Sequence, residues 1–210
     1  MNFKELASLV EFGKAKEVEE SVKNMLEDGL NPHDILNEGL LPGMNEVGQK
    51  WKNGKVFIPE VLIAARALNT GMKLLQERLA NANTSLGKIV LGTVKGDMHD
   101  IGKNLVGMML KSKGFNVIDL GTNVDSKGFI EAAKKHDAKF VCMSALLTTT
   151  MLYFKTVIED FEKEGLRDKV IILGGGAPVT EEFSKSVGCD YYANDAVSCA
   201  ELIYNLVKGA

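Results

Sequence analysis

Residues 88–104 read KIVLGTVKGDMHDIGKN, an apolar, β-branched run followed by a charged turn with glycine and the start of an amphipathic stretch. Further apolar runs follow at intervals that leave room for a helix, at 117–120, 140–143, 170–173 and 191–192. Short apolar runs that alternate with helix-length stretches are typical of βαβ units. Because the runs are nearly apolar throughout, both faces of the resulting sheet must be covered. We therefore predict an α/β fold with a parallel, doubly wound, five-stranded sheet.

A sheet of this kind is flavodoxin-like (Rossmann-type), and such sheets bind ligands at the carboxyl ends of their strands. Polar residues and glycines gather where the predicted strands end, at 95–102, 121–123, 144–150, 174–178 and 193–195. The sequence thus predicts a ligand site at this edge.

The first 80 residues show a helical period instead, with apolar residues three or four positions apart. Asn31-Pro32 and Ile58-Pro59-Glu60 each place a proline in the first turn of a helix. We predict four helices, at 2–11, 15–28, 32–50 and 59–80, packed as a four-helix bundle. The polar segment 81–85 has the composition of a linker. It divides the chain into a helical domain, 1–85, and an α/β domain, 86–210.

The composition is that of an ordinary globular protein, with 45% hydrophobic and 25% charged residues. A formal net charge of −3 gives no electrostatic reason to expect nucleic-acid binding. The first residues lack both a basic start and an uninterrupted apolar run, so neither a secretion signal nor a membrane span is expected. Three cysteines without a CxxC pair indicate reduced thiols. We expect a cytoplasmic protein that binds a protein or small-molecule partner.

The turn after the first predicted strand places His99 between Asp97 and Asp100. Gly102 follows at a position where the backbone must approach another group closely. One ring nitrogen of a histidine binds metal well only when an acceptor fixes the other, and either carboxylate could supply that acceptor. The alternative is that His99 caps the following helix. The residues of this turn leave both readings open.

Taken as a motif, Asp97-x-His99-x-x-Gly102 resembles the DxHxxG signature of cobalamin-binding domains. These occur in cobalamin-dependent methionine synthase and in the corrinoid proteins of methylamine- and methanol-type methyltransferase systems. Ser144-Ala145-Leu146 and Gly175-Gly176 match the SxL and GG parts of that signature, in order and at predicted strand ends. Residues 38–59 resemble the helical cap domain of the same proteins. The resemblance covers nearly the whole chain, although the stretch from Glu38 to Trp51 is one residue shorter than in methionine synthase, which has phenylalanine at the position of Trp51.

The resemblance implies that His99 is the lower axial ligand of cobalt and displaces the benzimidazole of the cofactor. Asp97 would accept the other imidazole N–H and Thr150 would hydrogen-bond Asp97, forming a relay whose proton content changes with the oxidation state of cobalt. For Thr150, the residues alone also allow an ordinary helix start.

Further cofactor contacts are implied in both halves of the chain. In the α/β half they are Gly96, Met98, Asp100, Gly102, Ser144, Leu146, Thr148, Gly175, Gly176 and Ala196. In the cap, Glu38, Trp51, Ile58 and Val61 would lie near the upper face of the corrin. Without the resemblance, Ile58 and Val61 read as bundle core, Met98 as core filler and the glycines as turns or a phosphate-binding loop.

The resemblance implies a corrinoid methyl carrier in methanogenesis or one-carbon metabolism, itself a non-catalytic subunit. A substrate-specific methyltransferase, with a methylamine or quaternary amine as preferred donor, would methylate cobalt(I). A second methyltransferase would pass the methyl group to a thiol or tetrahydrofolate, and a reductive activation protein would be a third partner. The alternatives are a cobalamin-dependent sensor or regulator, a subunit of an adenosylcobalamin mutase, and a metallohydrolase built on Asp97, His99 and Asp100.

Overall fold

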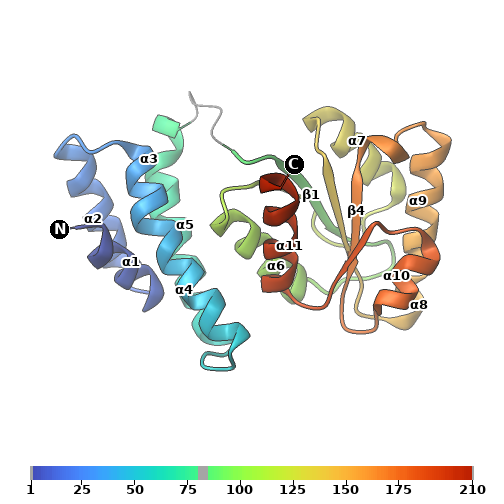
Figure 1. Cartoon of the computed structure of the whole chain (residues 1–210), viewed down its shortest axis with the longest axis horizontal. Helices are drawn as coiled ribbons and strands as arrows, with labels where there is room; N and C mark the ends of the chain where they lie inside the picture. Colours follow the sequence, from blue (N-terminus) through green and yellow to red (C-terminus); the bar gives the residue numbers. More distant parts are fainter. Residues whose placement is uncertain (1, 80–84, 210) are drawn as a thin grey trace. The chain divides into compact units, whose positions relative to one another are not determined.

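The computed structural model describes residues 2–79 and 85–209, with all their side chains except those of 76–79 (Figure 1). The chain divides into two compact units. One comprises Met1–Thr84 with Ser112–Gly114, and the other comprises Ser85–Lys111 with Phe115–Ala210. Apart from Ser85, the linker predicted at 81–85 lies outside the described residues.

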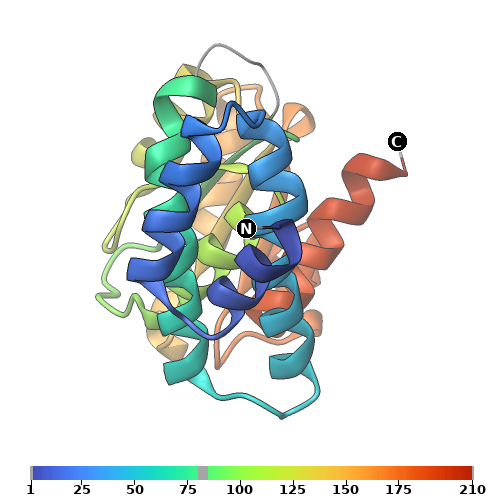
Figure 2. The same ribbon diagram turned by 90° about the vertical axis from the view of Figure 1, so that its left-hand side faces the viewer.

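The N-terminal unit is the predicted helical bundle. It consists of α1 (Phe3–Glu11), α2 (Ala15–Glu27), a continuous helical run made of α3 (Pro32–Asp34), η1 (Ile35–Leu40) and α4 (Leu41–Lys52), and finally α5 (Ile58–Leu79). Figures 1 and 2 show these helices side by side, with α2 packed on α5 and α1 packed on α4. Asn2 begins α1 with a capping box, because its side chain accepts from the Glu5 N–H while Glu5 bonds back to the Asn2 N–H.

The third predicted helix, at 32–50, differs from the prediction because η1 within it is a π-helix. The Leu41 N–H donates to the carbonyl of Leu36, five residues earlier instead of four. Pro42 follows directly, and in a regular α-helix its ring would clash with the carbonyl of Glu38. The wider turn thus lies where the proline would disrupt a regular helix.

Glycines let α1 approach this helical run closely. A Cβ built on Gly43 would lie 2.3 Å from the carbonyl oxygen of Ala7 and 2.8 Å from Cβ of Val10. One built on Gly39 would lie 2.7 Å from a methyl carbon of Leu6. The helices therefore pack at a spacing that only glycine permits at these positions.

The C-terminal unit contains the predicted five-stranded parallel sheet. Its strands are β1 (Lys88–Thr93), β2 (Asn116–Asp119), β3 (Phe140–Ser144), β4 (Ile171–Gly175) and β5 (Tyr191–Ala193). They lie in the order β2-β1-β3-β4-β5, and every neighbouring pair is parallel. This is the flavodoxin-like order, so the predicted fold class is confirmed. The direction of winding reverses between β1 and β3, which makes the loops after these two strands the expected place for a ligand.

Helices cover both faces of the sheet. They are α6 (Ile101–Ser112), α7 (Ser126–His136), the short α8 (Thr148–Met151), α9 (Tyr153–Lys163), α10 (Glu181–Val187) and α11 (Ala196–Lys208), with a 3-10 turn, η2, at Arg167–Lys169. Figure 1 shows α6 and α11 on one side of the sheet and α7, α9 and α10 on the other.

Each face of the sheet has its own buried core. The core on the α7 and α9 side includes Val90, Val141, Met143, Ile172, Phe129, Phe154, Val157 and Phe161. On the opposite face, α6 packs on β1, because a Cβ built on Gly107 would lie 3.1 Å from a methyl carbon of Leu91. There the thiols of Cys142 and Cys199 contact each other, and this hydrogen bond, together with burial, raises the pKa of Cys142. Cys142, Cys189 and Cys199 are all free and buried. Among the described helices, none is both long and apolar enough to cross a membrane.

Gly43→Ala should destabilise the helical bundle, because the added methyl group would overlap the α1 backbone. We expect a loss of about 1–3 kcal/mol in the free energy of unfolding, the usual cost of overpacking a core. Urea unfolding followed by far-ultraviolet circular dichroism would measure it. The matched control is Glu46→Ala at an exposed position of the same helix, where a change within about 0.5 kcal/mol is expected. Equal stability of the two variants would contradict the tight packing.

Candidate cofactor site

The candidate site is built on the two loops that flank the point where winding reverses. The loop after β1 turns sharply, since the Asp97 N–H donates to the Val94 carbonyl at 3.1 Å. Gly96 lies in this turn at φ +85°, a conformation that favours glycine. The Val94 N–H donates to the Ser144 carbonyl at 3.0 Å and so holds the loop beside the end of β3. Asp97 and the segment after Ser144 are thereby brought together across about 50 residues of sequence.

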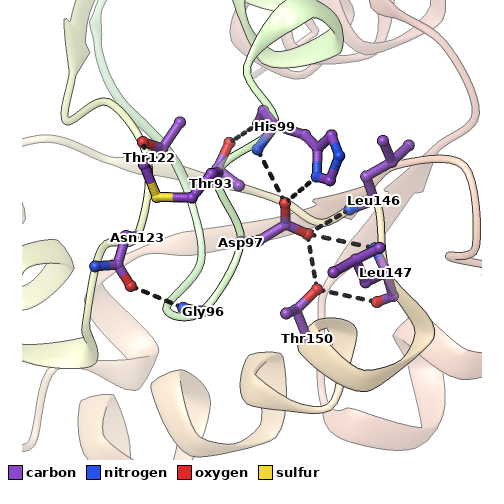
Figure 3. Close-up of polar contacts among 10 residues, drawn as sticks. Thr93, Gly96, Asp97, His99, Thr122, Asn123, Leu146, Leu147 and Thr150 are labelled. Carbon is purple, nitrogen blue, oxygen red and sulfur yellow. Dashed lines mark hydrogen bonds and ion pairs between the residues drawn. The ribbon is translucent and has the colours of Figure 1, made fainter.

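Asp97 is the centre of the site (Figure 3). Its side chain is fully buried and accepts five hydrogen bonds. One oxygen, Oδ1, lies 2.7 Å from Nδ1 of the His99 ring and 3.0 Å from the His99 backbone N–H. The other, Oδ2, accepts from the backbone N–H groups of Leu146 and Leu147, at 2.7 and 3.3 Å, and from the Thr150 hydroxyl at 2.7 Å.

These contacts keep Asp97 ionised. Burial by itself would raise the pKa of the Asp97 carboxyl. The hydrogen bonds from Leu146, Thr150 and His99 outweigh burial and hold that pKa well below its usual range. Asp97 is therefore a charged acceptor whose lone pairs are already used by donors of the protein.

His99 is oriented by this carboxylate. An ionised carboxylate can only accept, so Nδ1 carries a proton, and in the neutral form of the ring Nε2 has the free lone pair. The side chain is 51% exposed, and the Thr93 hydroxyl donates to the His99 carbonyl at 2.8 Å. The ring is thus anchored on one side and accessible on the other, which is the arrangement that a metal-binding histidine requires. The helix-cap alternative is not what the structure shows, because His99 Nδ1 bonds Asp97 rather than a backbone N–H of α6.

Thr150 lies within α8, and its hydroxyl bonds the Asp97 carboxylate. The same oxygen is 3.0 Å from the Leu147 carbonyl. The structure therefore brings His99, Asp97 and Thr150 into one hydrogen-bonded row, in the order that the resemblance implied.

The surface around His99 suits a large, flat, largely apolar group. Large apolar side chains on these loops and the helices that follow them are exposed. They are Met98, Ile101, Leu146, Leu147 and Leu152. Gly102 lies in the first turn of α6, and a Cβ built on it would meet no atom within 4 Å. An exposed imidazole within an apolar rim, beside the open backbone at Gly102, fits a corrin ring.

The remaining predicted contacts of this unit lie at the carboxyl edge of the sheet. Ser144 ends β3, Thr148 is exposed at the start of α8, and Ala196 is buried at the start of α11. The backbone packing around Gly175 and Gly176 by itself explains why these two positions are glycine. A Cβ on Gly176, at φ +128°, would lie 1.9 Å from the Ala145 carbonyl oxygen, and one on Gly175 would lie 2.9 Å from that of Ala193.

The four residues predicted in the cap have different environments. Glu38 is exposed on the π-helix, Trp51 is half-buried near the end of α4, and Ile58 is 43% exposed at the start of α5. Val61 is fully buried, as a residue of the bundle core would be.

Several residues of the site were not singled out from the sequence. Thr93 and Leu147 bond His99 and Asp97, as described above. Asn123 accepts from the Gly96 N–H at 2.8 Å, and Lys103 pairs with Asp119 at 2.6 Å. Polar residues at the end of the second predicted strand were the available signal, but their partners depend on how the strands are ordered.

Two family models, each described as a B12 binding domain, match residues 87–200 and 3–76. Dimethylamine corrinoid protein 3 of Methanosarcina acetivorans is 45% identical over 193 residues, which cover 91% of this chain and 90% of the relative. Trimethylamine corrinoid protein 1 of the same organism is 40% identical, over 84% of this chain and 83% of the relative.

Among solved structures, the methanol:cobalamin methyltransferase complex MtaBC from Methanosarcina barkeri contains a similar chain. It matches with a TM-score of 0.89 and 29% identity, over 98% of this chain and 79% of that chain. The resemblance carried by the DxHxxG, SxL and GG signatures is thus confirmed, and the chain belongs to the family of B12-binding corrinoid proteins.

Proposed function

We propose that the chain is a corrinoid methyl carrier in which His99 is the protein ligand to cobalt. The observation that carries the proposal is the geometry of His99, whose Nδ1 is held at 2.7 Å by a buried, ionised carboxylate while the ring stays accessible. The relatives named as methylamine corrinoid proteins support the same reading. When bound, the corrinoid supplies a cobalt ion that can take up a methyl group and release it.

The residues of the chain would set how strongly the cobalt is ligated. The Asp97 carboxylate orients the ring by accepting a hydrogen bond from Nδ1–H, and this bond would make Nε2 a better ligand for cobalt. The Thr150 hydroxyl and the N–H groups of Leu146 and Leu147 stabilise the negative charge on Asp97, so the imidazole keeps its proton on Nδ1. The row His99–Asp97–Thr150 would thereby hold a proton at Nδ1 of His99.

The α/β unit and the helical unit would have different roles. Residues 86–210 would hold the cofactor, with Gly96, Met98, Asp100 and Gly102 of the His99 loop among the residues that bind it. Ser144, Leu146, Thr148, Gly175, Gly176 and Ala196 would line the place of the nucleotide tail. Residues 1–85 would act as the cap, with Trp51, Ile58 and Glu38 as the cap residues that are not fully buried.

Metal-dependent hydrolysis at Asp97, His99 and Asp100 has less support. Both carboxylate oxygens of Asp97 already accept hydrogen bonds from the protein, and the Asp100 carboxylate accepts from the Asn104 side chain at 3.0 Å. Among the side chains that the structure describes, no three His, Cys, Asp or Glu residues are placed to hold a metal ion together.

A substrate-specific methyltransferase and a second methyltransferase would be the partners, since the similar chain of known structure is part of a methyltransferase complex. Methylamines are the preferred donor class, and a thiol or tetrahydrofolate is the proposed acceptor. A reductive activation protein would restore cobalt(I) after accidental oxidation.

Reconstitution with hydroxocobalamin tests the ligand directly. The loaded protein should show a visible spectrum with histidine as lower ligand, and His99→Ala should lose it because no other imidazole is held at this position. His136→Ala, at the end of α7, is the matched control and should keep the spectrum. A bound cofactor that still carries its benzimidazole on cobalt would refute the proposal.

The pH dependence of stability should report the ionised state of Asp97. Because the pKa of this carboxyl is lowered in the folded protein, its contribution is complete above the unfolded value, about 3.9, and is lost as the pH falls further. Urea unfolding of the cofactor-free protein should show a stability gap between wild type and Asp97→Asn, about 2 kcal/mol or more at pH 7, that shrinks below about pH 4. A gap of constant size would show that the charge of Asp97 is not favoured by folding.

The carrier role is tested by methyl transfer. The loaded protein, reduced to cobalt(I), is mixed with a methyltransferase for mono-, di- or trimethylamine, a quaternary amine or methanol, and with its methylated donor. Methylation, followed as a change in the visible spectrum, is expected with a methylamine-type enzyme and should identify the donor. No methylation with any of these enzymes would exclude the carrier role while leaving cofactor binding intact.

A further inference from the structure

We infer that the segment from Asp119 to Asn123, between β2 and α7, braces the loop that carries His99, and that Asn123 is a positioning residue for the metal ligand. The inference rests on the proposed function of His99. The residues of this segment lie on a neighbouring strand and loop, and they would affect ligation by His99 through the backbone of the His99 loop.

Asn123 holds the beginning of the His99 loop with two hydrogen bonds. Its side-chain oxygen accepts from the Gly96 N–H at 2.8 Å (Figure 3). Its backbone N–H donates to the Asp97 carbonyl at 2.9 Å. Gly96 and Asp97 are the residues whose turn directs the Asp97 carboxylate toward His99. Any movement of this turn would therefore move the acceptor of the His99 ring.

Asn123 adopts a left-handed backbone conformation, with φ +55°. Asparagine tolerates this conformation better than other non-glycine residues, because its short polar side chain can hydrogen-bond locally. The side-chain oxygen supplies the acceptor for the bond from Gly96, and the backbone N–H in this conformation supplies the bond to Asp97. Among the described residues, the other non-glycine with positive φ is Asp137, at the opposite end of α7.

The same segment holds the end of the His99 loop through an ion pair. Lys103 is 2% exposed, and its ammonium group lies 2.6 and 2.7 Å from the two carboxylate oxygens of Asp119. It also donates to the side chain of Asn104 at 2.7 Å, and Asn104 donates to Asp100 at 3.0 Å. The first turn of α6 is therefore tied to the last residue of β2.

Both anchors belong to a segment that is itself fixed to the sheet. The Leu120 N–H donates to the Leu91 carbonyl at 2.8 Å, and the Val124 N–H donates to the Thr93 carbonyl at 2.9 Å. The His99 loop is thus bound at 96–97 and at 103 to one rigid part of the molecule. Replacing a residue that orients a metal-binding histidine commonly weakens metal binding. The segment Asp119–Asn123 would have a similar but more indirect effect, because it holds the loop that carries His99 and Asp97.

Four variants separate the contributions of Asn123. Asn123→Ala removes the acceptor and disfavours the left-handed backbone, Asn123→Gly removes only the acceptor, and Asn123→Asp keeps both. Asp137→Ala is the matched control, because it imposes the same backbone cost on the same unit at the end of α7 away from His99. Each protein is loaded with hydroxocobalamin, and the ratio of histidine-ligated to unligated corrinoid is read from the visible spectrum. After chemical reduction to cobalt(II), which is paramagnetic, the same ratio is read from the electron paramagnetic resonance spectrum.

We expect that ratio to fall about five- to tenfold in Asn123→Gly and Asn123→Ala, the effect of about one lost hydrogen bond. Asn123→Asp should restore it and Asp137→Ala should leave it unchanged, although both alanine variants lose stability. A wild-type ratio in Asn123→Gly, or an equal fall in Asp137→Ala, would overturn the role of Asn123. If the wild type itself shows no histidine ligation that His99→Ala removes, the proposed function fails, and this inference fails with it.

Discussion

The buried carboxylate of Asp97 is the interaction on which the site depends. Burying a charge away from water costs free energy, and here five hydrogen-bond donors from three segments compensate for that cost. Those donors are on the His99 loop, on the backbone after β3 and on Thr150 in α8. The carboxylate therefore does two things together: it joins the loops on both sides of the winding reversal, and it fixes the imidazole that faces outward. Its charge and its position cannot be separated, because the hydrogen bonds from Leu146, Thr150 and His99 that hold the carboxylate also lower its pKa.

The sheet makes this convergence possible. Parallel strands place the ends of β1 and β3 next to each other, and the Val94–Ser144 hydrogen bond extends their pairing into the loops. At the end of β4, Gly176 passes so close to the Ala145 carbonyl that a side chain would not fit. The GG signature thus has a structural cause in addition to the cofactor contact proposed for it. A substitution there would displace the backbone that donates to Asp97 before it reached any ligand.

Much of this could be predicted from local sequence, because the relevant signals are local. Apolar runs separated by helix-length stretches indicate a parallel sheet, and the helical period of the first 80 residues indicates a bundle. The row His99–Asp97–Thr150 was available only through a resemblance that spans the three signature segments. The brace was not predicted: Asn123, Asp119 and Lys103 are common residue types in loops and helix ends. Their meaning appears only when β2 is known to lie beside β1.

The sequence by itself determined the two kinds of architecture, the position of the ligand loop at the end of a strand and the family. Tertiary structure alone decided which oxygen of Asp97 meets which donor, why a π turn lies just before Pro42, and which residues brace the His99 loop. The physical reason is the range of the interactions. Hydrophobic periodicity and turn chemistry act over a few residues, whereas the contact of Asp97 with Leu146 depends on the order of strands far apart along the chain.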